Sequence, residues 1–324
     1  MKNVINKKVI LLLVICLALG NLAGCQQADT AEYDENGKEI IIMGYLPITH
    51  ALAVFEAKEL IDKSPDSNIT VKLQKFSNWT DLMDALNSGK IQAASVLAEL
   101  AMGAVSQGIN LKAVALGHKD GNIVVVSNNI NSVEDLRGKT FAIPSNQSSH
   151  NILLQDMLAT AGMGFRDLNV IMLSPPEMPA SLASGAIDGY CVAEPFGTQA
   201  VLQGFGKTLY TSETLWENSI CCALVFNGKY LESHKASVDE FLKYYREGGQ
   251  NLDSREAKRI AVQYLGQKEP VLDESLKCIS YDDLELKEED YKVLYQKVKD
   301  YQINANPPSF EEFVYISGDS KEEK

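Results

Sequence analysis

A run of hydroxyl, amide and imidazole side chains at residues 145–151 has the chemistry to bind an anion or a polar group. The run Ser-Asn-Gln-Ser-Ser-His-Asn follows an apolar stretch at 140–143, which predicts a buried strand, and precedes apolar residues at helical spacing. The first N–H groups of a helix lack partners and lie at its positive end, so Ser148, Ser149 and His150 would offer donors to a ligand. The alternative is an ordinary N-cap, in which a serine satisfies one of those N–H groups.

This loop belongs to a chain in which predicted strands and helices alternate. The predicted strands occupy residues 40–45, 69–73, 92–96, 113–116, 123–127, 140–143, 170–173, 189–192 and 220–226, and predicted helices at 51–60, 80–87, 98–106, 149–161 and 195–203 separate most of them. Such alternation indicates parallel α/β sheets with ligands at the carboxyl ends of the strands. Thr49, His50, Trp79 and Leu97 follow strand ends, and we expect them to line a binding site.

The chain contains an internal repeat. Residues 86–93 (Leu-Asn-Ser-Gly-Lys-Ile-Gln-Ala) and 182–189 (Leu-Ala-Ser-Gly-Ala-Ile-Asp-Gly) are each followed by Ala-Glu and then Gln-Gly at similar distances. Each copy predicts a helix, a tight turn, a strand, an acidic loop and a helix. Together with the apolar return strand at 220–226, the repeat predicts two lobes, with residues 38–125 plus 222–324 in lobe 1 and 126–221 in lobe 2.

Histidine and cysteine are the residue types that would bind a soft metal, and both occur here. The chain has only four histidines, so His118 does not by itself indicate a metal centre. Cys221 and Cys222 are adjacent in a predicted strand, where neighbours point to opposite faces, which favours packing. We therefore predict no metal site and no cofactor. In an exported protein Cys191, Cys221, Cys222 and Cys278 could pair, but apolar surroundings favour buried free thiols for most of them.

The N-terminus predicts export and lipidation. Three lysines precede an apolar run at 9–19, and Leu-Ala-Gly-Cys follows at 22–25. This pattern is typical of a signal peptide over residues 1–24 and resembles the bacterial lipobox, in which Cys25 becomes the lipidated first residue. Polar residues 25–37 would form a tether. The predicted location is the extracytoplasmic face of the cell membrane.

Composition limits the possible partners. A hydrophobic fraction of 45% and a charged fraction of 23% are those of a globular protein. The net charge is −13, and it becomes −16 without residues 1–24, which hold three lysines and no acidic residue. So acidic a chain has no basic surface for nucleic acid, and we predict none as a partner.

Five motifs in order resemble one family. They lie at residues 44–49, 149–150, 175–178, 187–196 and 211–216, and the similarity extends over about residues 40 to 226. The chain resembles the solute-binding proteins of nitrate, bicarbonate, sulfonate and taurine ABC importers. The resemblance implies a two-lobed periplasmic-binding-protein type II fold with two hinge strands. It also implies a small-molecule ligand in the cleft, permease and ATPase subunits as partners, a monomer, and no enzymatic activity.

The resemblance also implies site residues. The positions that hold the anion in nitrate binders correspond here to Trp79, Asn122, His150 and Cys222, and the last replaces a lysine. A neutral thiol cannot replace an ammonium that faces an anion, so nitrate is disfavoured and a polar or organic ligand is expected. Glu194, before Pro195, would contact the ligand or cap a helix. Two other functions stay open, namely binding or synthesis of a thiamine-pyrimidine precursor, as in relatives of this fold, and surface sensing.

Replacing Cys25 by alanine tests the anchor. Cys25→Ala removes the only atom to which lipid would be attached, so the variant should move from the membrane fraction to the soluble fraction. Fractionation followed by immunoblotting measures this shift. Equally firm membrane association of the variant and the unmodified chain would contradict lipidation at Cys25.

Overall fold

The computed structural model describes residues 31–317. The predicted signal peptide and Cys25 lie outside the described residues. The strands are β1 (Glu39–Tyr45), β2 (Ile69–Lys75), β3 (Ala93–Leu97), β4 (Leu111–Leu116), β5 (Lys119–Asp120), β6 (Asn122–Val126), β7 (Thr140–Ile143), β8 (Asn169–Met172), β9 (Gly189–Ala193), β10 (Lys207–Thr211), β11 (Cys222–Asn227) and β12 (Ile279–Ser280).

Helices separate these strands. The α-helices are α2 (Leu52–Lys63), α3 (Trp79–Asn87), α4 (Ala98–Ser106), α5 (Ser149–Thr160), α6 (Met178–Ala183), α7 (Phe196–Leu202), α8 (Ser212–Leu215), α9 (Gly228–Ser233), α10 (Lys235–Asn251), α11 (Ser254–Leu265), α12 (Glu269–Ser275), α13 (Glu288–Asp300) and α14 (Phe310–Phe313), and the short 3-10 turn η1 spans Thr49–Ala51. Among the described residues, no helix has the length and apolarity that crossing a bilayer requires.

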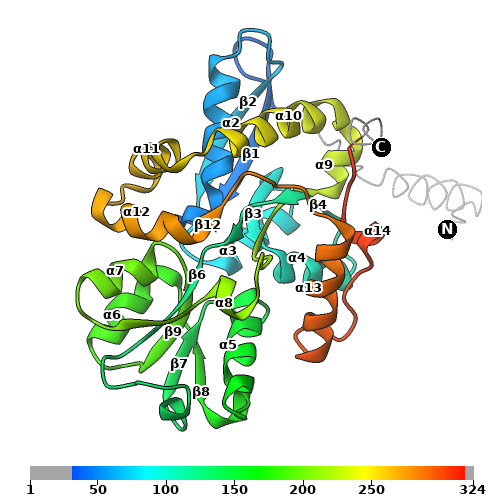
Figure 1. Cartoon of the computed structure of the whole chain (residues 1–324). Helices are drawn as coiled ribbons and strands as arrows, with labels where there is room; N and C mark the ends of the chain where they lie inside the picture. Colours follow the sequence, from blue (N-terminus) through cyan, green and yellow to red (C-terminus); the bar gives the residue numbers. More distant parts are fainter. Residues whose placement is uncertain (1–30, 318–324) are drawn as a thin grey trace, which may run out of the picture. The chain divides into compact units, whose positions relative to one another are not determined.

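Ten of the strands form two separate five-stranded sheets, and β5 and β12 pair with each other as an antiparallel two-stranded sheet (Figure 1). In the first sheet, of order β2-β1-β3-β11-β4, the pairs β1–β2 and β1–β3 are parallel, and β11 is antiparallel to both neighbours. In the second sheet, of order β10-β6-β9-β7-β8, β7 is parallel to β8 and β9, and β6 is antiparallel to β9 and β10. The predicted alternation of strands and helices is confirmed.

The chain passes twice between the sheets. It leaves the first sheet after β4 and has entered the second by β6, whose five residues all pair with β9. It returns between β10 and β11. Strand pairing therefore puts the first crossing at residues 117–121, earlier than the lobe boundary predicted at residue 125. The arrangement of the two sheets as separate lobes with these boundaries stays a prediction.

The tether predicted for residues 25–37 is structured at its end. The carboxylate of Asp34 accepts hydrogen bonds from the backbone N–H groups of Asn36 and Lys38, at 2.8 and 2.9 Å. The hydroxyl of Thr70, in β2, donates to the same side chain at 2.8 Å. These bonds hold a turn against the first sheet, so a flexible linker would have to end before Asp34.

The two repeat copies adopt matching conformations. α3 and α6 end at Ser88 and Ser184, and both of these C-caps have φ −80° and ψ −8°. The glycines that follow, Gly89 and Gly185, have φ of +75° and +73°, a left-handed conformation that costs glycine no steric strain. β3 and β9 then follow, each with all five residues buried.

The C-terminal helices contact elements of both sheets. α10 packs along α2, and α12 lies against α7 (Figure 1). Lys297 of α13 donates to Asp156 of α5 at 2.8 Å, and Tyr301 donates to the same carboxylate. Residues beyond β11 therefore help hold the second sheet's helices beside the first sheet.

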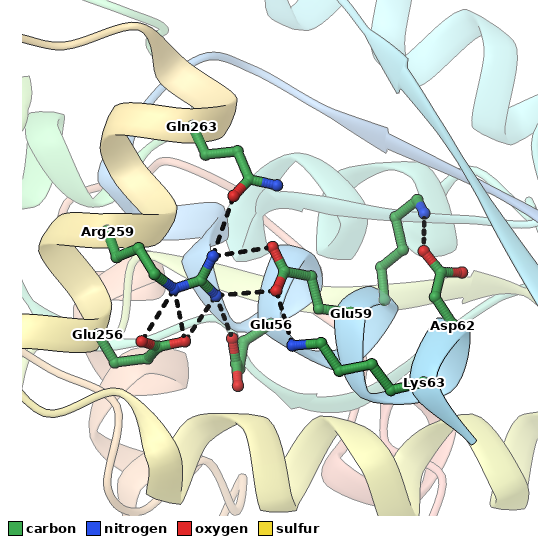
Figure 2. Close-up of polar contacts among 8 residues, drawn as sticks. Glu56, Glu59, Asp62, Lys63, Glu256, Arg259 and Gln263 are labelled. Atoms are coloured by element: carbon green, nitrogen blue, oxygen red, sulfur yellow. Dashed lines mark hydrogen bonds and ion pairs between the residues drawn. The ribbon is translucent and has the colours of Figure 1, made fainter.

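An ion cluster fastens α11 to α2 (Figure 2). The Arg259 guanidinium lies 2.8 Å from Glu59, 3.5 Å from Glu56 and 2.6 Å from Glu256. Burial opposes ionisation of Glu59, but hydrogen bonds from Arg259 and Lys63 outweigh it and lower the pKa of Glu59 to about 2. The side chains of Glu56 and Glu59 are only 5% and 11% exposed, so they depend on this guanidinium for compensation.

We predict that Arg259→Leu destabilises the fold by about 2 kcal/mol at pH 7. Breaking a buried pair costs about 3–5 kcal/mol, and solvent screening of the half-exposed guanidinium reduces that figure. Because the pKa of Glu59 is lowered to about 2 from 4.5, its stabilisation is full above pH 4.5 and is lost as pH falls towards 2. The difference between the variant and the unmodified chain should therefore shrink between pH 7 and pH 3, as measured by urea unfolding.

Lys292→Leu is the matched control, because Lys292 pairs with Glu288 at 2.8 Å while the two side chains are 72% and 53% exposed. Because solvent screens so exposed a pair, this change should leave the stability nearly unaltered. Equal losses in the two variants would contradict a structural role for the Arg259 cluster.

Candidate functional site

Polar residues after four strand ends meet in the interior. His50 lies in η1 after β1, and Glu194 follows β9. Glu99 is the second residue of α4, after β3, and His150 is the second residue of α5, after β7. His50, His150 and Glu194 have no solvent-exposed area, and Glu99 is 1% exposed. In each sheet the carboxyl ends of the parallel strands open onto one edge, so His50 and Glu99 share an edge of the first sheet, and His150 and Glu194 share an edge of the second. The hydrogen bond from the Thr49 hydroxyl to the Glu194 carbonyl joins the two edges.

Two histidines and two cysteines form the centre of this cluster. The Nδ1 atom of His50 lies 3.6 Å from the Sγ atoms of both Cys221 and Cys222, and the two sulfurs are 4.0 Å apart. The rings of His50 and His118 lie with their centroids 3.5 Å apart and their planes tilted by 35°. One donor atom from each of these four residues lies within 4.8 Å of the others.

The expectation that Cys221 and Cys222 point to opposite faces of a strand is wrong. β11 begins only at Cys222, so Cys221 lies in the incoming segment, where alternation does not apply. Its sulfur turns to the same side as that of Cys222. Cys191, Cys221, Cys222 and Cys278 are all free thiols, as the apolar surroundings favour. The prediction that this pair serves only packing therefore loses its geometric basis.

Residues 148–150, at the start of α5, have two different roles. Ser148 is the N-cap of α5: its hydroxyl accepts from the Asn151 N–H at 3.2 Å and donates to the Ser145 carbonyl at 2.6 Å. The Ser149 hydroxyl and both ring nitrogens of His150 have no hydrogen-bond partner within residues 31–317. A buried donor without a partner costs about 1–3 kcal/mol, so Ser149 and His150 are the groups that a ligand would satisfy.

Glu194 has the capping role that the sequence left open. Its carboxylate accepts from the N–H and the hydroxyl of Thr198, at 3.0 and 2.7 Å, in the first turn of α7. The Thr49 hydroxyl donates to the Glu194 carbonyl at 2.9 Å and joins η1 to the second sheet. Burial raises the pKa of Glu194 to about 7, although the bonds from Thr198 oppose this. Thr49 and Glu194 thus fix the site's geometry.

The other predicted site residues differ in how closely they join the cluster. Asn122 begins β6, and its Oδ1 atom lies 3.7 Å from the Cys221 sulfur, while its Nδ2 has no partner among the described residues. Leu97 pairs with Cys222 across the first sheet. Trp79 begins α3, is 5% exposed, and its indole Nε1 is likewise a buried donor without a partner in the described part of the chain.

The site residues predicted from the sequence do not include Glu99. Both carboxylate oxygens are buried without a hydrogen-bond partner in residues 31–317. Burial raises its pKa well above the usual range, and the nearby Cys221 adds to the effect. The repeat was the available signal, since Glu99 in the first copy corresponds to Glu194 in the second. His118 and Cys221 were likewise left out of the predicted site, because nothing in the sequence places His118 beside the cysteine pair.

Burial keeps the imidazoles of His118 and His150 neutral. Burial, the largest effect, lowers the pKa of His118 and of His150 to about 4. Burial raises the pKa of Cys222 well above its usual value. Burial also opposes ionisation of Cys221, but the hydrogen bond with Cys222 and the neighbouring imidazoles lower its pKa. At neutral pH His118 and His150 therefore offer uncharged ring nitrogens, and Cys221 is the more acidic of the two thiols.

Two α/β sheets with strand ends around a buried polar cluster define a class of protein, and known structures agree. The chain has the fold of the two-lobed periplasmic binding proteins of ABC importers. One solved structure is the ligand-binding component of an ABC-type import system from Staphylococcus aureus with zinc bound. It is 36% identical, with a TM-score of 0.82 over 86% of this chain and 97% of that chain.

The chain belongs to the NMT1-like family, which matches residues 34–266. A putative aliphatic sulfonates-binding protein from Escherichia coli is 26% identical over 80% of this chain and 81% of its own length. The nitrate import ATP-binding protein NrtC from Synechocystis is 26% identical over 71% of this chain. The chain spans only 38% of the length of that second relative. The resemblance inferred from the five motifs is confirmed.

Glu194→Gln should make the fold less sensitive to alkaline pH. Because the folded-state pKa of Glu194 is raised to about 7 from 4.5, its protonated form stabilises the fold below pH 4.5, and this contribution is lost as pH rises through 7. The loss amounts to about 3 kcal/mol at 1.36 kcal/mol per pKa unit. Glutamine keeps an acceptor for the Thr198 N–H without ionising. Denaturant unfolding at pH 5 and pH 8 should show the variant gaining about 2–3 kcal/mol relative to the unmodified chain at the higher pH.

Glu217→Gln is the control, since Glu217 is exposed and should give no such pH-dependent gain. A parallel pH dependence in Glu194→Gln and the unmodified chain would show that the Glu194 carboxyl does not titrate abnormally.

Proposed function

We propose that this protein is the extracytoplasmic substrate-binding component of an ABC importer and captures a small solute in the buried cluster. The observation that carries the proposal is a set of interior polar atoms at the strand ends that have no hydrogen-bond partner among the described residues. These atoms are Trp79 Nε1, both Glu99 carboxylate oxygens, His118 Nδ1, Asn122 Nδ2, Ser149 Oγ and both His150 ring nitrogens. Native interiors satisfy nearly all such groups, and a bound solute would satisfy several at once.

Of the predicted contact set, the residues with unmet groups are proposed to touch the solute directly. These are Trp79, Asn122, Ser149 and His150. Thr49, Ser148 and Glu194 position the site, because their polar side-chain atoms already have partners. The Thr49 hydroxyl bonds the Glu194 carbonyl, while the side chains of Ser148 and Glu194 accept from N–H groups in the first turns of α5 and α7. His50, Leu97 and Cys222 complete its wall from the first sheet.

Because the site is buried, it must open before a solute can bind. His50, Asn122, Ser149 and His150 have no exposed surface, so a solute can enter only if the elements around the cluster separate. The chain crosses between the two sheets twice, and these two crossings are the natural points for that movement. Release to a permease would require the same opening.

The relatives favour binding and transport over catalysis. Their names refer to aliphatic sulfonates, to nitrate import and to a structure with zinc, so they do not point to one ligand. A segment similar to this chain occurs within a protein named as an import ATP-binding protein, which supports permease and ATPase subunits as partners. Lipidation at Cys25, the membrane location and the monomeric state belong to the same proposal. Pyrimidine synthesis and surface sensing have no observation in their favour.

A thermal-shift screen tests solute capture. The protein is first treated with a chelator, so that a metal ion does not contribute to the shift. The compounds are nitrate, bicarbonate, alkanesulfonates, taurine and pyrimidine-like molecules. A solute at a hundredfold its Kd stabilises the fold by about 2.7 kcal/mol. His150→Ala should weaken binding of that solute by about 1–3 kcal/mol if the bonded group is charged, because it removes both ring nitrogens.

His234→Ala is the matched control. The His234 ring hydrogen-bonds the Tyr230 carbonyl at 3.1 Å, between α9 and α10, and contributes nothing to the cluster. This variant should bind the solute as the unmodified chain does. A solute that binds equally to His150→Ala and the unmodified chain would place capture outside this site.

A further inference from the structure

Three of the four donor atoms at the centre of the cluster, the two sulfurs and His50 Nδ1, are spaced as the ligands of a tetrahedral ion are. Metal–ligand bonds of about 2.3 Å to sulfur and about 2.0–2.1 Å to nitrogen give tetrahedral edges of about 3.8 Å between sulfurs and about 3.6 Å between sulfur and nitrogen. The corresponding separations here are 4.0 Å between the two sulfurs, and 3.6 Å from each sulfur to His50 Nδ1. His118 supplies the fourth donor within 4.8 Å of the others.

The hydrogen bond on the far side of His50 fixes which nitrogen is free. Its Nε2 lies 2.9 Å from the Gly121 carbonyl, which can only accept, so Nε2 carries the hydrogen. In the neutral ring the Nδ1 lone pair then points at the two sulfurs. Metal-binding histidines characteristically donate their other ring N–H in this way, which orients the ring and raises its basicity.

His118 is held in place but not saturated. The Cys222 N–H reaches its Nε2 at 3.4 Å, and its Nδ1 has no partner within residues 31–317 although the side chain is fully buried. A buried imidazole in this state has an unmet interaction that a bound ion would supply.

We propose that His50, His118, Cys221 and Cys222 bind one divalent transition-metal ion of the zinc type. Two thiolates and two neutral imidazoles are the donors that such an ion prefers over the oxygen-seeking Mg²⁺ and Ca²⁺. On binding, each thiol loses its proton to solvent, and the two negative charges balance the ion. The loaded site is therefore electrically neutral, which suits its burial.

The position of the four residues gives the ion a role in the proposed function. His118 lies in the first crossing between the sheets, Cys221 and Cys222 lie at the end of the second, and His50 hydrogen-bonds the first crossing through Gly121. An ion held here is a ligand of the same buried site and ties the two crossings together. The import role rests on the proposed function, whereas metal binding itself does not.

Metal titration of the reduced, metal-free chain tests the inference. Zn²⁺ competed against a chromophoric chelator should bind at one ion per chain and displace the protons that the two thiols still carry. Co²⁺ should give the intense absorption of a tetrahedral site with a thiolate-to-metal charge-transfer band. Cys222→Ser should lower zinc affinity about a hundredfold or more, since even loss of an outer hydrogen-bond partner costs about 10–100-fold. Cys221→Ser should do the same.

Cys191→Ser is the matched control, because Cys191 is a fully buried free thiol outside the four-residue set. It should keep both the stoichiometry and the cobalt spectrum. Absence of a one-to-one complex, a cobalt spectrum without the thiolate band, or equal weakening by Cys191→Ser would overturn the inference. The cobalt spectrum of the unmodified chain decides the matter even if a cysteine variant fails to fold. A solute hit in the chelator-treated screen without zinc binding would remove the metal and leave the proposed function intact.

Discussion

The antiparallel insertion of β11 between β3 and β4 is the interaction on which the site depends. It holds the backbone of the cysteine pair from both sides, because the Cys221 carbonyl accepts from the Ala98 N–H at 2.9 Å and the Cys222 carbonyl from the Gly117 N–H at 2.7 Å. These two bonds aim both sulfurs at His50. Without this pairing, the second crossing would have no fixed point beside the first, and the histidines and cysteines would not meet.

The cluster concentrates groups that weaken a fold unless something binds them. Glu99, Asn122 and His150 all carry buried atoms without partners among the described residues, and each such atom costs stability. The surrounding apolar core, continuous through β1, β3 and β11, offsets this cost. Solute and ion binding would give these atoms partners and so restore part of the lost stability. The same unpaired atoms that weaken the fold therefore favour binding.

The repeat shows how two similar units have diverged at one position. Glu99 and Glu194 both follow a buried strand and both have raised pKa values. Four residues after Glu194 is Thr198, whose hydroxyl and N–H satisfy the carboxylate. Four residues after Glu99 is Gly103, which has no side chain, and an added Cβ there would lie 3.0 Å from the Gln147 amide. The Glu194 carboxylate therefore holds the start of α7, whereas the Glu99 carboxylate has no hydrogen-bond partner among the described residues.

The sequence by itself determined the alternation of strands and helices, the repeat, the family and the strand-end loops at His50, His150 and Glu194. These follow from local periodicity and short motifs, which nearby residues control. It also indicated both roles for residues 148–150, and only hydrogen bonding separated the capping Ser148 from the unpartnered Ser149 and His150. Tertiary structure alone decided the meeting of His50, His118, Cys221 and Cys222, because strand order and register bring together residues up to 172 positions apart. Local alternation gave the wrong orientation for Cys221, since the exact residue at which β11 begins depends on its pairing with β3 and β4.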